Sequence, residues 1–345
     1  MNSMKAVVKR DLKGAVLEEV AVPACGDFDV LVEVLAASIC GSDINRYNWE
    51  SGKGPYKFKT PMILGHELCG RIVQTGACVT HWEPGQLVVA ETHIPCGRCY
   101  QCETGNSHIC AGVQVFGFHT DGCFANYFSF PSICARPLPK GVSIEEGPLM
   151  EPLGVAYHAL SKSNINGDTV AIIGCGPIGL LAVQVASSMG AAHIIAMSRS
   201  EFKLDLAKKF GAGHILDVAR ENPVEEVLSI TGGQGVGTVI ECSGDAAAFT
   251  QGLKMARKGG TFVAVGIPKR PLEVDVAGDI VRKELTIHGM HGRHMFKTWY
   301  SITALVEQGV IEFGPLLTAK LPLEEFEEAF SLAQSKEHLK VLLIP

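Results

Sequence analysis

The chain has 345 residues, of which 47% are hydrophobic and 19% charged, and a formal net charge of -6. This length is above the size at which one hydrophobic core usually keeps growing, so we expect two domains. The charges are spread along the chain without a basic stripe or a long run of one sign, which argues against nucleic acid as a partner.

The N-terminal segment alternates apolar and charged residues, as a first strand does, and it lacks the apolar core of a signal peptide. Longer apolar stretches such as 170–186 are interrupted by glycine and proline. They therefore fit a buried strand and helix better than a membrane span. We expect a cytoplasmic protein with no membrane partner.

Roughly the first 150 residues are predicted to be rich in β-structure. Short valine- and isoleucine-rich runs at 29–40, 69–76 and 87–94 are separated by Gly, Pro and Asp turns. This half of the chain also contains nearly all the candidate metal ligands.

Three segments of this half offer ligands for an open metal site: Cys40, the neighbours His66 and Glu67, and Glu151. Each residue alone is weak support, because a single Cys is more often a packing residue and a single Glu a solvated one. Together, a thiolate, an imidazole and a carboxylate form the mixed ligand set of a catalytic zinc. Such an ion polarises an alcohol oxygen and favours loss of hydride from the adjacent carbon.

Four of the twelve cysteines form a second candidate metal site. Cys96, Cys99, Cys102 and Cys110 follow the spacing C-x2-C-x2-C-x7-C. Four thiolates close the coordination shell of zinc and leave no position for water, so this spacing predicts a structural zinc. The alternatives are a coincidental grouping or an iron–sulfur cluster, whose spacing begins in the same way but continues with a shorter step and a proline.

From about residue 166 to 290, predicted strands and helices alternate, which calls for a parallel sheet wrapped by helices. Two further helical stretches and a final strand at 340–344 follow. A G-x-G-x-x-G fingerprint lies between the first of these strands and its helix, where its backbone N–H groups can bind a dinucleotide pyrophosphate. Its residues are Gly174, Gly176, Pro177, Ile178 and Gly179.

The end of the second strand bears on the choice between NAD and NADP. No acidic residue stands where one would accept hydrogen bonds from the ribose of NAD. Ser198 and Arg199 instead offer a hydroxyl and a guanidinium that suit a 2′-phosphate, and Lys203 is a further cation. We therefore favour NADP over NAD; in the alternative reading, Arg199 only stacks on adenine and either cofactor binds.

These motifs resemble the zinc-containing medium-chain alcohol dehydrogenase family over essentially the whole chain. Residues 65–79 match the signature G-H-E-x2-G-x5-G-x2-V, and the four-cysteine loop and the glycine fingerprint follow in the family's order. Within the family, residues 38–49, 91–99 and 291–300 are most similar to the L-threonine 3-dehydrogenase branch.

The resemblance implies an α/β chain with three parts. A GroES-like, β-rich, zinc-binding catalytic domain is expected over 1–152, and a Rossmann domain with a doubly wound parallel sheet over 153–294. Residues 295–345 are expected to return to the catalytic domain. The family also implies two zinc ions per subunit, a small alcohol or ketone substrate and a homo-oligomer, either a tetramer or a dimer.

Carried over position by position, Cys40, His66 and Glu67 are implied to bind the catalytic zinc, and Glu151 either binds zinc or assists proton transfer. Ser42 stands at the hydroxyl that passes the substrate proton on, and His93 is expected near the substrate. The implied cofactor contacts are Ile178, Ser198, Lys203, Val265, Gly266, Ile267, Met290 and His291.

Two departures from the branch concern the substrate. Asn45 stands where a histidine usually follows the relay hydroxyl, and an amide cannot act as a base near neutral pH. A relay must then leave through water, the cofactor ribose or Glu151. The Ser198–Arg199 pair is the second departure. An NADP-dependent dehydrogenase or reductase acting on a polyol, amino alcohol or amino sugar is the alternative.

The other histidines are expected to be structural or solvated, and the seven remaining cysteines to lie in the core. Arg293, Trp299 and Tyr300 either shape the cleft or a subunit contact, or simply pack a helix. Two other classes of function remain. A zinc-free reductase of activated double bonds is one, but the presence of Cys40, His66 and Glu67 together argues against it. A non-catalytic binding module is the other, but the intact open zinc site and glycine fingerprint argue against it.

Overall fold

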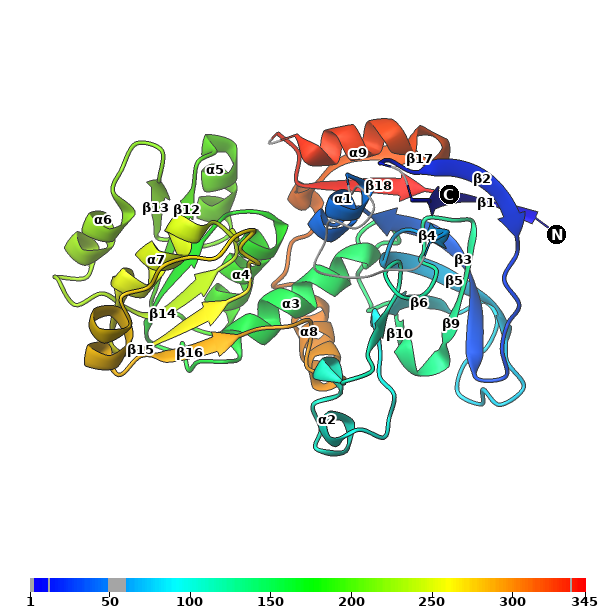
Figure 1. Cartoon of the computed structure of the whole chain (residues 1–345), viewed down its shortest axis with the longest axis horizontal. Coiled ribbons are helices and arrows are strands. Elements are labelled where there is room, and N and C mark those ends of the chain that lie inside the picture. Colours follow the sequence, from blue (N-terminus) through cyan, green and yellow to red (C-terminus); the bar gives the residue numbers. More distant parts are fainter. Residues whose placement is uncertain (1–2, 12, 49–59, 336) are drawn as a thin grey trace. The chain divides into compact units, whose positions relative to one another are not determined.

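A computed structural model describes residues 3–11, 13–48, 60–335 and 337–345 (Figure 1). The chain divides into two compact units, one of Met1–Glu151 with Phe313–Pro345 and one of Pro152–Glu312. The second unit therefore extends past residue 294, where we expected the return, and includes helix α8 (Lys297–Glu307). Among the described residues, every helix is too short or too polar to cross a lipid bilayer.

The first unit is built on β-sheets. Its largest sheet has the order β10-β6-β5-β3-β18-β17, with β9 also paired to β3. The strands of this sheet are β3 (Asp29–Ser38), β5 (Glu67–Thr75), β6 (Leu87–Ala90), β9 (Tyr127–Pro131), β10 (Ala135–Pro137), β17 (Leu317–Pro322) and β18 (Lys340–Ile344). The smaller sheets contain β2 (Val16–Ala21), β1 (Ser3–Lys9) and β4 (Met62–Ile63), and β7 (His93–Ile94) with β8 (Gln114–Val115).

Apolar strand faces and an aromatic cluster form the core of this unit. Phe116 packs against Phe128 and Phe130, with ring centroids 4.9 and 5.4 Å apart. Helix α1 (Gly41–Tyr47) is joined to α9 (Phe326–Gln334) by stacking of Tyr47 on Phe330. The remaining helices are α2 (Tyr100–Glu103) and the start of α3 (Met150–Leu160).

Strand β18 comes from the far end of the sequence and lies antiparallel to β3, with Leu342 opposite Ser38 (Figure 1). Four of its five residues are buried. This pairing brings Lys340 into the neighbourhood of the residues that follow β3.

The second unit is a parallel sheet with the order β13-β12-β11-β14-β15-β16. In terms of sequence this is 3-2-1-4-5-6, the doubly wound order whose switch point lies between β11 and β14. The strands are β11 (Thr169–Ile173), β12 (His193–Ser198), β13 (His214–Asp217), β14 (Val236–Glu241), β15 (Ala256–Ala264) and β16 (Thr286–Gly289), and the helices are α4 (Pro177–Ser188), α5 (Glu201–Lys209), α6 (Pro223–Ile230), α7 (Ala246–Met255) and α8. The predicted fold class is confirmed.

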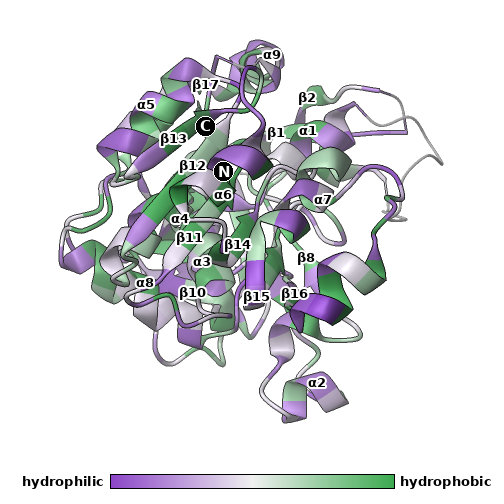
Figure 2. Ribbon diagram, turned by 90° about the vertical axis from the view of Figure 1, so that its left-hand side faces the viewer, coloured by the Kyte–Doolittle hydropathy of each residue, from purple (hydrophilic) through white to green (hydrophobic). Residues whose placement is uncertain are grey.

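Hydropathy explains how the helices cover this sheet. The central strands are apolar, whereas α5 carries both hydrophobic and hydrophilic residues (Figure 2). In α5, Leu204 and Ala207 are buried, whereas Lys208 and Lys209 are exposed. The prediction that all seven cysteines outside the metal sets lie in the core was wrong for Cys78, which is exposed on the loop after β5.

Candidate functional site

Cys40, His66 and Glu67 come together in the first unit. Their ligand atoms all lie within 4.8 Å of one another. Strand pairing explains the meeting, because Ser38 at the end of β3 is opposite Glu67 at the start of β5. Gly65 has a φ of +94°, and a Cβ there would approach the Phe124 ring to 2.3 Å, so only glycine fits before the histidine.

Asp43 orients two of these three residues. It is fully buried on α1, where its Oδ1 lies 3.2 Å from His66 Nδ1 and its Oδ2 accepts a hydrogen bond from the Cys40 N–H at 3.0 Å. Burial opposes ionisation, but the charge and hydrogen bond of His66 hold the pKa of Asp43 below its usual value. With Nδ1 held by this carboxylate, Nε2 is the nitrogen of His66 that can bind a metal.

Arg46 lies one turn further along α1 and is also buried. Its Nη1 is 3.6 Å from Asp43 Oδ1 and donates to the Gly117 carbonyl, while the guanidinium lies over the Phe118 ring. Burial is the main reason why the pKa of Arg46 falls to about 10, still far above neutral. Its charge therefore balances that of Asp43 behind the three ligands.

Glu67 is held by Lys340 on β18. Its Oε2 accepts hydrogen bonds from Lys340 Nζ and from the Ser38 hydroxyl, and Lys340 also donates to the Ile39 carbonyl at 3.3 Å. Burial raises the pKa of Glu67, Lys340 opposes that rise, and the charge of Glu151 adds to it. Glu151, in the first turn of α3, is buried, but the described group whose ligand atoms lie within 4.8 Å of one another consists of Cys40, His66 and Glu67 and does not include it.

The remaining predicted catalytic residues are distributed around this unit. Ser42 is half-buried on α1, and Asn45 is exposed on the same helix. His93 is buried, and its Nδ1 lies 2.8 Å from the fully buried Glu91 Oε1. The structure therefore adds Asp43, Glu91 and Lys340 to the residues singled out from the sequence.

Only the first of these three had a local signal, since Asp43 lies in the same C-G-S-D segment as Cys40. Glu91 is two residues from His93, a spacing that alone indicates nothing. Lys340 begins an otherwise apolar strand, and a charge at the head of an apolar strand is the single sequence feature that could have marked it.

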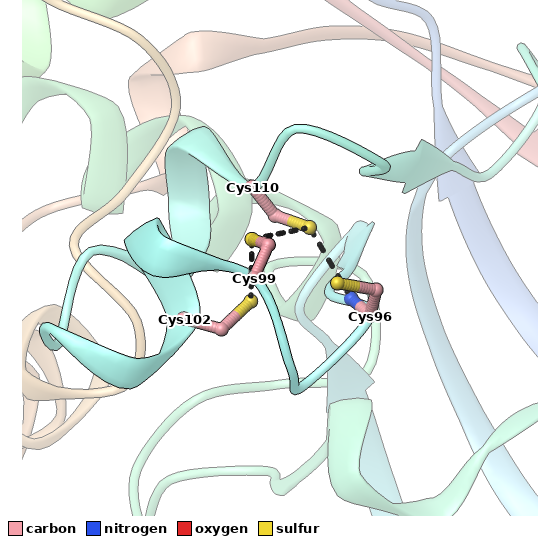
Figure 3. A group of neighbouring side chains, drawn as sticks. All are labelled: Cys96, Cys99, Cys102 and Cys110. Atoms are coloured by element: carbon pink, nitrogen blue, oxygen red, sulfur yellow. Dashed lines mark hydrogen bonds between the residues drawn. The ribbon is translucent and has the colours of Figure 1, made fainter.

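The four clustered cysteines face a common centre (Figure 3). Cys99 Sγ lies 3.5 Å from Cys102 Sγ and 3.7 Å from Cys110 Sγ. A tetrahedron with Zn–S bonds of about 2.3 Å separates its sulfurs by about 3.8 Å, so these thiols fit zinc. A backbone hydrogen bond from Cys102 is the main reason why the pKa of Cys99 falls to about 6, which favours the thiolate that a metal requires.

The glycine fingerprint lies between β11 and α4, and each glycine has a separate steric role. Gly174 has a φ of +94°. A Cβ at Gly176, the N-cap of α4, would meet nothing within 4 Å, which leaves room for a ligand at the helix N-terminus. A Cβ at Gly179 would lie 1.9 Å from the Gly174 carbonyl oxygen, so glycine permits close packing of helix and strand.

The other predicted cofactor contacts follow the carboxyl ends of the parallel strands. Ile173, Met197, Glu241, Ala264 and Gly289 are in register from strand to strand. The segments that follow them carry the predicted residues Ser198, Arg199, Val265, Gly266, Ile267, Met290 and His291. Parallel strands thus bring these residues to one edge of the sheet.

Lys203, in the first turn of α5, lies near the same edge. It is half-buried, and burial lowers its pKa while the Cys175 thiol within the glycine fingerprint opposes that fall. The predicted cation is therefore on the helix that follows β12, whose carboxyl end is in register with that of β11.

Comparisons with known proteins agree with this geometry. Residues 26–140 match the alcohol dehydrogenase GroES-like domain family, and residues 177–308 match the zinc-binding dehydrogenase family. The chain is 43% identical to L-threonine 3-dehydrogenase of Bacillus velezensis over 344 residues, which is 99% of each chain.

Solved structures show the same fold over the whole chain. A Sinorhizobium meliloti protein bound to NADP is 33% identical, with a TM-score of 0.93 over 100% of both chains. The 2R,3R-butanediol dehydrogenase of Bacillus subtilis is 28% identical, with a TM-score of 0.89 over 99% of both chains.

Proposed function

Because this chain belongs to the zinc-containing medium-chain alcohol dehydrogenases, we propose that it oxidises L-threonine at its secondary hydroxyl. The chain is an oxidoreductase that acts on the CH–OH group of a secondary alcohol with a nicotinamide cofactor. The convergence of Cys40, His66 and Glu67 within 4.8 Å carries the proposal, since sulfur, nitrogen and oxygen donors together fit a catalytic zinc.

The chain's own residues prepare this centre. Asp43 holds His66 in one tautomer, and Lys340 holds the carboxylate of Glu67, which would bind the metal. When bound, zinc supplies a Lewis acid that favours ionisation of the substrate hydroxyl, and the nicotinamide supplies the hydride acceptor. Glu67 or Glu151 would supply the fourth ligand.

The substrate proton leaves through Ser42. Its hydroxyl, on the half-buried face of α1, can accept a proton and pass it on, whereas the amide of Asn45 cannot. Glu151 is buried beside Glu67, and a carboxylate there can take the proton directly or through water. His93, whose Nδ1 is held by Glu91, is the residue that we propose contacts the substrate.

A second zinc, held by Cys96, Cys99, Cys102 and Cys110, has a structural role in the proposal. The sulfur separations of 3.5 and 3.7 Å support it. All twelve cysteines are free thiols, so none of the four is held in a disulfide. Four protein ligands leave no position for substrate, so this ion stabilises its loop.

NADP is the proposed cofactor. Support comes from the Ser198–Arg199 pair at the end of β12, from Lys203 beside the glycine fingerprint, and from the NADP-bound relative of Sinorhizobium meliloti. Gly174, Gly176 and Gly179 hold the pyrophosphate at the start of α4, and the segments at 265–267 and 290–291 contact the nicotinamide half.

A homo-oligomer, either a dimer or a tetramer in the cytoplasm, completes the proposal. Strand β16 ends the six-stranded sheet, and its Ile287 is 40% exposed. The backbone N–H and C=O groups along an exposed edge strand are suited to pairing with another chain. Light scattering after size-exclusion chromatography measures the assembly directly.

A steady-state screen tests the proposed reaction. Zinc-loaded protein is assayed with L-threonine, simple secondary alcohols, polyols and amino sugars, each with NAD and NADP, by absorbance of the reduced nicotinamide. We expect turnover of L-threonine, faster with NADP, and its loss in Cys40→Ser. Turnover of a polyol or amino sugar without threonine supports the alternative substrate class that Asn45 and Ser198 favour, and an active Cys40→Ser enzyme contradicts the zinc assignment.

A further inference from the structure

Glu241, the last residue of β14, ties together two loops at the cofactor edge of the sheet. Its carboxylate accepts hydrogen bonds from the backbone N–H groups of Ser243 at 2.7 Å and Gly244 at 3.1 Å, and from the Ser243 hydroxyl. Its backbone carbonyl accepts from the N–H groups of Val265 at 2.9 Å and Gly266 at 2.8 Å. One residue thus organises both the loop after β14 and the loop after β15.

The loops after β14 and β15 pack too closely to admit a side chain at their glycines. A Cβ at Gly266 would lie 2.2 Å from the Gly244 nitrogen and 2.7 Å from Glu241 Oε2. A Cβ at Gly174, in the glycine fingerprint, would lie 2.9 Å from the Ser243 Cβ. The pyrophosphate loop, the loop after β14 and the loop after β15 therefore take their positions from contacts around one carboxylate.

The charge of Glu241 is buried and has no cationic partner. The residue is fully buried, and across the part of the chain that the structure describes, its carboxylate meets hydrogen-bond donors but no lysine, arginine or histidine within ion-pair distance. Burial raises the pKa of Glu241 above its ordinary value, and the hydrogen bonds from Ser243 and Gly244 oppose that rise and favour the ionised form. A cation that binds nearby gains from it, because the interior screens charges weakly.

The position of Glu241 in the sheet identifies that cation. Glu241 lies opposite Ile173 across the switch point between β11 and β14. A dinucleotide crosses the sheet at such a point, with its pyrophosphate at the helix after β11. Ser198 and Arg199 end the strand on the adenosine side, so β14 and β15 take the nicotinamide half.

We propose that Glu241 is a positioning residue for the nicotinamide half of the cofactor and that its charge favours the oxidised ring over the reduced one. The oxidised ring is positively charged and the reduced ring neutral, so a fixed negative charge discriminates between them. This inference rests on the proposed use of a nicotinamide cofactor.

Binding measurements test it without turnover. Dissociation constants for NADP+ and NADPH are measured by calorimetry and by nicotinamide fluorescence on the zinc-loaded protein without alcohol. In Glu241→Gln, which keeps the shape, we expect NADP+ to bind about tenfold more weakly relative to NADPH than in the native protein. The control Glu307→Gln removes the same charge from an exposed position on α8 and leaves the ratio unchanged.

A second variant separates positioning from charge. Ser243→Ala keeps Glu241 but removes one of its donors, so we expect both forms to bind about three- to tenfold more weakly with the same ratio. An unchanged ratio in Glu241→Gln overturns the role of the charge, and native affinity in Ser243→Ala overturns the positioning role, whether or not Glu241→Gln folds. If the native protein binds neither NADP form nor the NAD forms, the proposed function itself fails.

Discussion

Replacing Lys340 by methionine isolates the buried pair beside the candidate catalytic zinc. The side chains of Lys340 and Glu67 are 4% and 1% exposed, so neither charge is screened by water. Removing one member of a buried pair leaves an uncompensated charge and costs about 3–5 kcal/mol of the free energy of unfolding. With a urea dependence of about 2–3 kcal/mol per molar, the midpoint of the transition of this unit falls by about 1–2.5 M.

The assay is urea unfolding followed by circular dichroism, with and without zinc. Without the lysine, Glu67 can be compensated by the metal, so we expect a smaller loss in the zinc-loaded protein. Lys320→Met on β17 is the matched control, because its partner Glu145 is 48% exposed and such surface pairs contribute about 1 kcal/mol or less. A Lys340→Met variant as stable as this control, or equally weakened with and without zinc, refutes the reasoning.

Four further predictions follow from the same structure. Asp43→Asn lowers zinc affinity by about 10- to 100-fold in competition with a chelator, since it weakens the hold on His66; unchanged affinity contradicts this role. Cys99→Ser loses one zinc equivalent per chain by elemental analysis and lowers the thermal midpoint, and full metal content contradicts the structural site. Arg199→Ala raises the Michaelis constant for NADP by about 10- to 100-fold and that for NAD far less. Equal increases for NADP and NAD contradict a 2′-phosphate pocket at Arg199. Burial lowers the pKa of His158 to about 4, below its unfolded value. The neutral form therefore stabilises the fold above about pH 6.5, and that stability is lost as the pH falls toward 4. We expect His158→Gln to reduce this loss in urea midpoints measured against pH, and an unaltered pH profile contradicts the role of His158.

Much of the fold could be predicted from local pattern. The alternation of apolar runs and helical stretches from 166 to 290 gave the doubly wound sheet, because each strand is bounded by glycine or polar turns. The sequence pattern does not predict helices α6 and α7: α6 is a short helix that begins at Pro223, and α7 begins with three alanines that carry little periodic signal.

The candidate site was predictable where its residues share a short segment. Cys40, His66 and Glu67 stand out by residue type, and the four cysteines by spacing. Lys340 did not, since it is 273 residues from Glu67 and meets it only because β18 pairs with β3. Glu241 was not predictable for a different reason. A single glutamate at the end of a strand has no distinctive sequence neighbours, and its contacts form only when the loops after β14 and β15 fold around it.

The pairing of β18 with β3 also determines when, during translation, the main sheet of the first unit can be completed. At elongation rates of about 5–20 residues per second, the 273 residues from Glu67 to Lys340 take roughly 14 to 55 seconds to translate. During that interval β3 and β5 have emerged from the ribosome without the strand that completes their sheet, whereas residues 152–312 form a contiguous unit that can fold as soon as it is made. The nascent chain therefore finishes its second unit before its first. Until then, Cys40 and the four clustered cysteines belong to a unit whose main sheet lacks its last two strands.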